Sequence, residues 1–136
     1  MRGISLLLIG VVAASCAASA KQPARTAKAE ATYQKLLAGK VAQAPISCLP
    51  TRKANDMVVI DENTIAFKDG NSRVYINHPQ GACNQLGQGH TALVSEQFAQ
   101  KGPCRGDVAQ VVDTLSHMTL GSCALGDFTP YVKQGA

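Results

Sequence analysis

Four cysteines in the last two thirds of this 136-residue chain constrain its fold more than any other feature. They are Cys48, Cys83, Cys104 and Cys123, so their spacings contain neither a C-x-x-C pair for a metal nor a C-x-x-C-H haem motif. An even number of cysteines in a small exported chain predicts two disulfides. The foldable part has roughly 90 residues, a length at which covalent links compensate for a modest core.

Four cysteines allow three disulfide connectivities. A chain reversal near residues 114–116 separates the apolar runs 108–112 and 117–120. Antiparallel partners around that reversal share an index sum of about 227, which places Cys104 opposite Cys123 at a spacing that suits a disulfide. We therefore predict Cys104–Cys123 and, by elimination, Cys48–Cys83.

The N-terminus carries the pattern of an export signal. Residues 1–3 form a short basic start, and residues 4–14 are an uninterrupted apolar run. This run is shorter than the roughly 20 residues that span a bilayer but fits the apolar region of a secretory signal. We predict that residues 1–20 are a signal peptide.

Two processing sites are open for this signal. Ala18-Ser19-Ala20 fits signal peptidase cleavage before Lys21. Residues 13–16 resemble a bacterial lipobox, although Ala13 replaces the usual leucine. Cys16 directly follows the apolar run and precedes a polar stretch, so we favour cleavage before Cys16 and lipidation of its thiol. By resemblance to lipoprotein sorting rules, Ala17 points to the periplasmic face of the outer membrane.

The net charge of +4 lies outside the main domain. Residues 21–40 carry five basic side chains and Glu30, whereas residues 41–136 carry seven basic and eight acidic ones. A near-neutral domain argues against a nucleic-acid partner. The basic stretch could attract anionic lipid headgroups, but it is more typical of a mobile tether. We expect a basic linker with a short helix over 21–45.

Apolar periodicity predicts one helix. Residues 26–38 favour helix, and Tyr33, Leu36, Leu37 and Val41 recur at the spacing of one helical face. Thr26 is expected to cap the start of this helix, and Gly39 follows its end.

The rest of the chain predicts short strands. Runs 57–60, 64–67 and 73–77 are joined by turns at 61–63 and 69–71, the second with a D-G hairpin signal. Runs 46–52, 91–98, 108–112 and 117–120 are further candidate strands. This pattern predicts a mainly β fold, a small antiparallel sandwich or partly open barrel over 46–132, preceded by one short N-terminal helix.

A loop rich in Gly, Pro, Asn and Gln between two strand runs is the predicted binding surface, because a disulfide at Cys83 would hold it rigid. The alternative is a loop of turn formers without a ligand. The side chains offered for binding are Asn77, His78, Asn84, Gln85, Gln88 and His90.

Catalytic and cofactor motifs do not appear. The sequence lacks G-x-S-x-G, S-x-x-K, a P-loop and G-x-G-x-x-G. His78, His90 and His117 share no metal-ligand spacing, and the Arg-Gly-Asp run at 105–107 is more simply a turn. We therefore expect no metal, no cofactor and no catalytic residues.

Cysteine-anchored motifs carry a family resemblance over residues 46–132. They are Cys48-Leu49-Pro50, Thr64-Ile65-Ala66-Phe67, Tyr75-Ile76-Asn77, Cys104-Arg105-Gly106-Asp107 and Cys123-Ala124-Leu125-Gly126-Asp127-Phe128. The chain resembles a family of small bacterial exported proteins of unknown function. The resemblance implies a four-cysteine domain in the cell envelope, and it implies no activity.

Three functional hypotheses follow. The first is a non-enzymatic cell-envelope protein, lipid-anchored to the membrane, that binds another envelope protein or has a structural role. The alternative is an inhibitor of an envelope-attacking hydrolase, and the third is a small periplasmic hydrolase. A deep cleft lined by acids or histidines would favour the hydrolase. A protruding, disulfide-braced loop would favour the inhibitor, and a flat surface would favour a scaffold.

Overall fold

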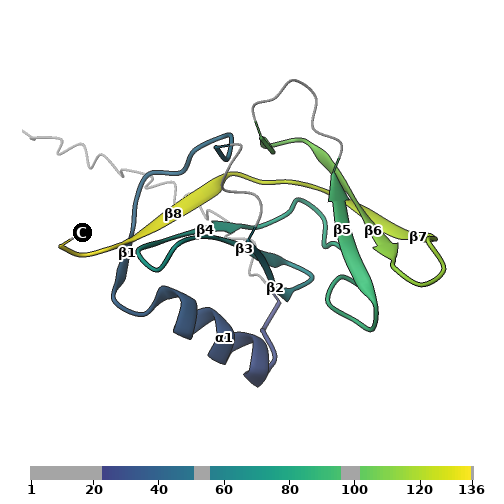
Figure 1. Ribbon diagram of the computed structural model, residues 1–136, viewed down its shortest axis with the longest axis horizontal. Helices are drawn as coiled ribbons and strands as arrows, with labels where there is room; N and C mark the ends of the chain where they lie inside the picture. The colour runs from purple at the N-terminus through teal and green to yellow at the C-terminus, as the bar shows by residue number, and fades with distance from the viewer. Residues whose placement is uncertain (1–22, 51–55, 96–101, 136) are drawn as a thin grey trace, which may run out of the picture.

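The computed structural model describes residues 23–50, 56–95 and 102–135 and shows one helix and two antiparallel sheets (Figure 1). The five-stranded sheet has the order β1-β8-β4-β3-β2, and the three-stranded sheet has the order β5-β6-β7. The described strands do not close into a barrel, so the expected mainly β fold with one short helix is confirmed as a small antiparallel sandwich. The elements are α1 (Ala27–Leu37), β1 (Lys40–Ala42), β2 (Met57–Asp61), β3 (Thr64–Asp69), β4 (Arg73–Asn77), β5 (Thr91–Ser95), β6 (Val108–Asp113), β7 (Thr119–Ala124) and β8 (Phe128–Lys133).

The predicted helix is confirmed together with its cap. Thr26 accepts a hydrogen bond at Oγ1 from the Ala29 amide at 3.3 Å, which satisfies one of the free donors of the first turn. Tyr33 and Leu36 pack against the five-stranded sheet, as the periodicity indicated. Val41 was expected on the same helical face but lies exposed in β1, because the helix ends before Gly39.

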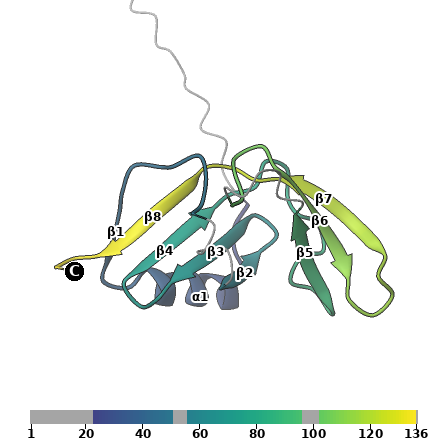
Figure 2. The same cartoon turned by 45° about the horizontal axis from the view of Figure 1, so that its top comes forward.

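The five-stranded sheet buries side chains on both faces. Helix α1 covers one face, and the three-stranded sheet stands at an angle beside the β2 edge (Figure 2). Ala66, Val74 and Ile76 face α1, whereas Ile65 and Phe67 face the three-stranded sheet. This follows from the alternation of side chains along a strand. The core between the sheets also contains Leu49, Tyr75, Cys83, Leu86, Ala109, Val111, Cys123, Leu125 and Phe128.

Strands β2, β3 and β4 form the predicted three-strand meander, and β5, β6 and β7 overlap the predicted runs. Residues 96–98 of the run 91–98 lie outside the described residues. The run 46–52 was expected to be a strand, but only Ile46 and Cys48 make isolated bridges. Residues 51 and 52 of that run lie outside the described residues. Pro50 limits this segment, because proline cannot donate to a strand ladder.

Strands β1 and β8 were not expected, and β8 is the strand between β1 and β4. Strand β8 contains Pro130, a residue that is uncommon in central strands because it lacks an N–H donor. The Pro130 carbonyl accepts a hydrogen bond from the Gln43 amide at 2.8 Å, just past the last ladder pair, Ala42 and Tyr131. The Pro130 nitrogen points to the same side of the strand, beyond the end of the β1–β8 ladder, so its missing N–H removes no hydrogen bond from that ladder. Residues 23–45, expected as linker and helix, thus supply a packed helix and an edge strand.

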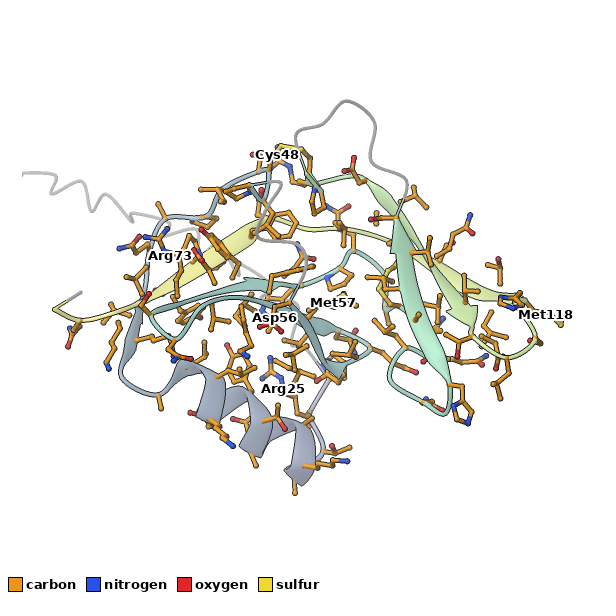
Figure 3. The ribbon with its side chains drawn as sticks, viewed as in Figure 1. Arg25, Cys48, Asp56, Met57, Arg73 and Met118 are labelled. Atoms are coloured by element: carbon orange, nitrogen blue, oxygen red, sulfur yellow. A yellow bond between two sulfur atoms is a disulfide. The ribbon has the colours of Figure 1, made fainter. Side chains whose placement is uncertain are left out.

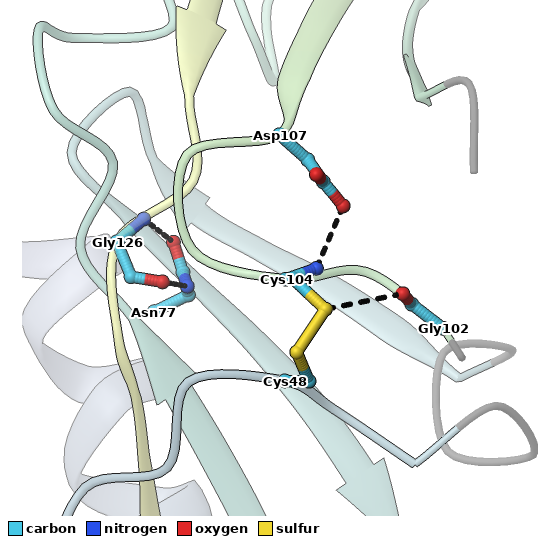
Figure 4. The surroundings of a disulfide bond; sticks show 6 residues. All are labelled: Cys48, Asn77, Gly102, Cys104, Asp107 and Gly126. Carbon is cyan, nitrogen blue, oxygen red and sulfur yellow. Dashed lines mark hydrogen bonds between the residues drawn. A yellow bond between two sulfur atoms is a disulfide. The ribbon is translucent and has the colours of Figure 1, made fainter. Parts of the chain in front are cut away.

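The disulfides join Cys48 to Cys104 and Cys83 to Cys123, so the predicted connectivity is wrong. In the β6–β7 hairpin Ala109 faces Cys123, which gives an index sum of 232, five more than the reversal at 114–116 suggested. Cys104 therefore lies beyond the hairpin, where it forms an antiparallel bridge with Cys48 (Figure 4). That bridge is supported by hydrogen bonds from Leu49 N to Pro103 O and from Arg105 N to Ser47 O.

Candidate functional site

Asn77, the first residue of the predicted binding loop, is fully buried, and its side chain hydrogen-bonds to the backbone of Gly126. Its Nδ2 donates to the Gly126 carbonyl at 2.8 Å, and its Oδ1 accepts from the Gly126 amide at 3.2 Å (Figure 4). Gly126 itself leaves no room for a side chain, since a Cβ there would overlap the His78 carbonyl oxygen. The Asn77 amide is thus used to join β4 to the segment before β8, and the side chain does not reach the surface where the predicted binding loop lies.

The rest of the predicted loop lies flat against the turn between β2 and β3. Glu62 accepts hydrogen bonds at Oε1 from the Gln85 amide at 2.7 Å and from Gln88 Nε2 at 2.9 Å. The Glu62 carbonyl accepts from the Cys83 amide at 2.8 Å, and Leu86 is buried beneath the loop. Asn84, Gln85, Gln88 and His90 remain exposed. The structure brings these four side chains to the surface, but the loop does not project.

His78 lies apart from them, half-buried, with its Nδ1 at 3.1 Å from the Asn63 carbonyl oxygen. Among the described residues, no group of three or more His, Cys, Asp or Glu side chains is placed to hold a metal ion. Arg105 and Asp107 of the Arg-Gly-Asp run both make local contacts. Arg105 Nη1 pairs with Asp127 at 3.2 Å, and Asp107 Oδ2 accepts from the Cys104 amide at 2.7 Å (Figure 4).

A groove of about 470 Å³ lies between the chain leading into α1, the β2–β3 turn and the loop at 86–88. Its two acidic side chains are engaged: Glu62 by the loop, and Asp61 by Arg25 Nε at 3.4 Å and the Asn63 amide at 2.8 Å. Arg25 also stacks over the Tyr33 ring at 4.1 Å. Asp61 and Glu62 therefore make structural contacts in this groove.

Burial, followed by a hydrogen bond with Tyr131, raises the pKa of Tyr33 to about 12. The neutral phenol is therefore part of the contact between α1 and the five-stranded sheet. The nearby Arg25 guanidinium opposes this shift, because a positive charge favours tyrosinate.

The turn between β6 and β7, residues 113–118, is the most exposed apolar feature of the described chain, and we call it the hairpin tip. Leu115 is 70% exposed and Met118 is 63% exposed. Met118 lies at one extreme of the molecule's longest axis (Figure 3). Soluble proteins expose single apolar residues often, but two large ones on one short turn at the end of the molecule form a candidate contact surface.

The hairpin tip has a fixed backbone. Asp113 Oδ1 accepts hydrogen bonds from the Leu115 amide at 2.9 Å and from the Ser116 amide at 2.8 Å. These bonds lower the pKa of Asp113, since they stabilise its carboxylate. The Thr114 amide and hydroxyl both donate to the His90 carbonyl, at 2.7 and 2.9 Å. The tip is thereby tied to the end of the loop that Cys83–Cys123 links to β7.

The sequence predicts a chain reversal here, and no function is predicted for it from the sequence. The available signal was the turn-forming pair Asp113 and Ser116 around Leu115, with Met118 shortly after. Turns are dominated by Gly, Pro, Asn, Asp and Ser, so two large apolar side chains so close together in a turn are a signal that the sequence contains.

Comparison of the chain with protein-family models, curated proteins and solved structures finds no match. The resemblance to a family of small exported proteins therefore stays a prediction. Within the described residues, no helix is both long and apolar enough to cross a membrane. The signal peptide, cleavage before Lys21 and lipidation at Cys16 fall outside the described residues and also stay predictions.

Proposed function

We propose that this chain is a non-enzymatic protein of the cell envelope that binds another envelope protein through the hairpin tip. The observation that supports this most is the pair of exposed apolar side chains, Leu115 and Met118, on a turn fixed by Asp113. Burial of each in a partner's pocket contributes about 1.5–3 kcal/mol. A fixed turn also loses little conformational freedom on binding.

Export and lipid anchoring belong to the same proposal. Two disulfides suit an oxidising compartment such as the periplasm. Lipidation of Cys16 would hold the domain at the periplasmic face of the outer membrane. Intact-mass measurement of the mature N-terminus tests this step, and a free amino group on Lys21 would exclude the lipid anchor.

Inhibition of an envelope-attacking hydrolase is the second candidate, and the position of the hairpin tip favours it. The tip ends the β6–β7 hairpin at one end of the molecule (Figure 1), and a disulfide braces β7 behind it. A narrow projection with two apolar side chains can enter an active-site cleft. The hydrolase hypothesis has less support, because Asp61 and Glu62 of the first groove are engaged in structural bonds.

In-cell photo-crosslinking tests the proposal. A photoreactive amino acid replaces Leu115 in one variant and the exposed Ala44, on the segment after β1, in a matched control. We expect a discrete adduct from position 115 that disappears when Met118→Asp is added, with no such adduct from position 44. If both positions capture the same abundant envelope proteins, the tip is not a specific binding surface.

Inhibition is tested with the purified chain and a set of peptidoglycan hydrolases. The wild type is expected to slow the lysis of peptidoglycan by at least one of them, and the Leu115→Asp/Met118→Asp double variant is expected to have lost that effect. Equal inhibition by both chains would argue that any inhibitory surface lies elsewhere.

A further inference from the structure

A second groove of about 470 Å³ lies at the other end of the helix layer, where the C-terminal part of α1 meets β2, β3 and β4. Leu36, Val58 and Val74 give it an apolar floor. Lys35, Lys40 and Lys68 also line it. The combination of an apolar floor and an ammonium rim fits an anionic group attached to an apolar body.

A fourth lysine extends the rim. Lys133 is the direct partner of Lys40 in the β1–β8 pair, so both side chains project from the face of the sheet that α1 covers. Like charges placed directly opposite each other destabilise a sheet. An anion between them would remove this repulsion. We call Lys35, Lys40, Lys68 and Lys133 the lysine rim.

Few acidic groups balance the lysine rim. Lys68 Nζ pairs with Asp56 at 3.2 Å, and the Asp56 side chain is 60% exposed, so solvent screens the pair. Lys40 Nζ donates to the Leu36 carbonyl at the end of the helix, and no ion pair of Lys40 is found among the described residues. The next charged residues, Asp69 and Arg73, are opposite each other in the β3–β4 register and alternate to the other face. Four lysines and Asp56 leave a local charge of +3.

We propose that the lysine rim and its groove dock on the headgroups of an anionic phospholipid surface. The rim lies at the end of the molecule formed by β1 and the β3–β4 turn, opposite the β6–β7 hairpin (Figure 1). When the lysine rim contacts a bilayer, the hairpin tip at the opposite end of the molecule points away from the lipid.

This inference stands apart from the proposed function, because it needs neither a protein partner nor a lipid anchor. The exported chain carrying Cys16→Ser, which cannot be acylated, is mixed with vesicles of phosphatidylcholine alone or with one third phosphatidylglycerol. Co-sedimentation gives the partition coefficient. Each basic residue near such a surface raises the partition coefficient about fivefold. The Lys35→Gln/Lys133→Gln variant is therefore expected to have a partition coefficient about 25-fold lower on the anionic vesicles.

The matched control is Lys28→Gln/Arg105→Gln, which removes the same charge from α1's first turns and from the segment before β6. It is expected to lose less than about fivefold, because these side chains lie away from the rim. Equal losses in the two double variants would show a net-charge effect and overturn the proposal. So would equal binding to both vesicle types. Displacement by inorganic phosphate at matched ionic strength would assign the groove to a free anion instead, and would also overturn it.

Discussion

Replacing Asn77 by alanine tests whether its buried amide, which the sequence predicts to lie in a binding loop, has a structural role instead. The change removes Nδ2 hydrogen bonds to the Gly126 carbonyl at 2.8 Å and the Asp127 carbonyl at 3.3 Å, and a bond from the Gly126 amide to Oδ1 at 3.2 Å. Asp127 is half-exposed, so water can replace its bond. Gly126 is buried, so its amide and carbonyl stay unsatisfied.

An unsatisfied buried polar group costs about 1–3 kcal/mol. With two such groups on Gly126 and the cavity left by the shorter side chain, Asn77→Ala is expected to lower the free energy of unfolding by about 3–5 kcal/mol. This is a large part of the roughly 5–15 kcal/mol available to a domain. Urea unfolding of the oxidised chain, followed by far-ultraviolet circular dichroism, measures the loss.

Asn84→Ala is the matched control, because Asn84 is exposed on the same loop, and it should change stability by less than about 0.5 kcal/mol. Asn77→Asp adds a pH test. A carboxylate facing two carbonyls is destabilised, so burial raises the folded-state pKa of the new carboxyl above its unfolded value. The Asn77→Asp variant is then most stable at pH values below the pKa that this carboxyl has in the unfolded chain. It loses stability as the pH rises through the pKa of the folded state. Equal stabilities for Asn77→Ala and Asn84→Ala would refute this reasoning and return Asn77 to the candidate ligand contacts.

The other predictions concern close packing, the two disulfides and Tyr33. Gly126→Ala is expected to destabilise by about 1–3 kcal/mol in urea, because its Cβ would overlap the His78 carbonyl oxygen. Gly121→Ala, whose Cβ would lie 3.5 Å from the Asn84 carbonyl oxygen, is the milder control, and equal losses would contradict this account. Under native conditions a thiol reductant should open Cys48–Cys104 before Cys83–Cys123, because Cys48 is exposed and Cys83 is fully buried. Alkylation and mass spectrometry give the order, and labelling of Cys83 first would count against it. The pKa of Tyr33 is raised from 10.0 to about 12, so its contribution to stability is complete below pH 10.0 and is lost as the pH rises through about 12. Absorbance titration should show a late tyrosinate step in the wild type, and its persistence in Tyr33→Phe would disprove the assignment.

Local signals allowed the helix and the meander to be predicted from the sequence. Thr26, the apolar spacing of Tyr33 and Leu36, and the turn at 69–71 each act within a few residues of the element they define. Strand β8 depends on partners far away in the chain, and Pro130 concealed it. Pro130 is tolerated in β8 because it lies past the end of β1. Which residues of two distant strands face each other cannot be predicted from local sequence patterns.

The cysteine pairing and the candidate site were harder to predict for the same reason. The predicted register of the β6–β7 hairpin differs by five positions from the observed one, so Cys123 does not face Cys104. It forms its disulfide with Cys83 instead. The polar loop was correctly placed at the surface for Gln85 and Gln88 but not for Asn77, whose partner lies 49 residues away. Leu115 is exposed because it lies in the turn beyond the last ladder pair of β6 and β7, Val112 and Thr119, and the sequence pattern alone does not show which side chains of a turn are covered.

The place of β8 in the sheet has a consequence for the order in which the strands can pair. Strand β1 pairs, among the described strands, only with β8, and β2 to β7 lie between the two in the sequence. Until β8 has joined the sheet, β1 has no strand partner and β4 has one open edge. Because pairing β1 with β8 closes a long loop of chain, completion of the five-stranded sheet is expected to be a late step of folding.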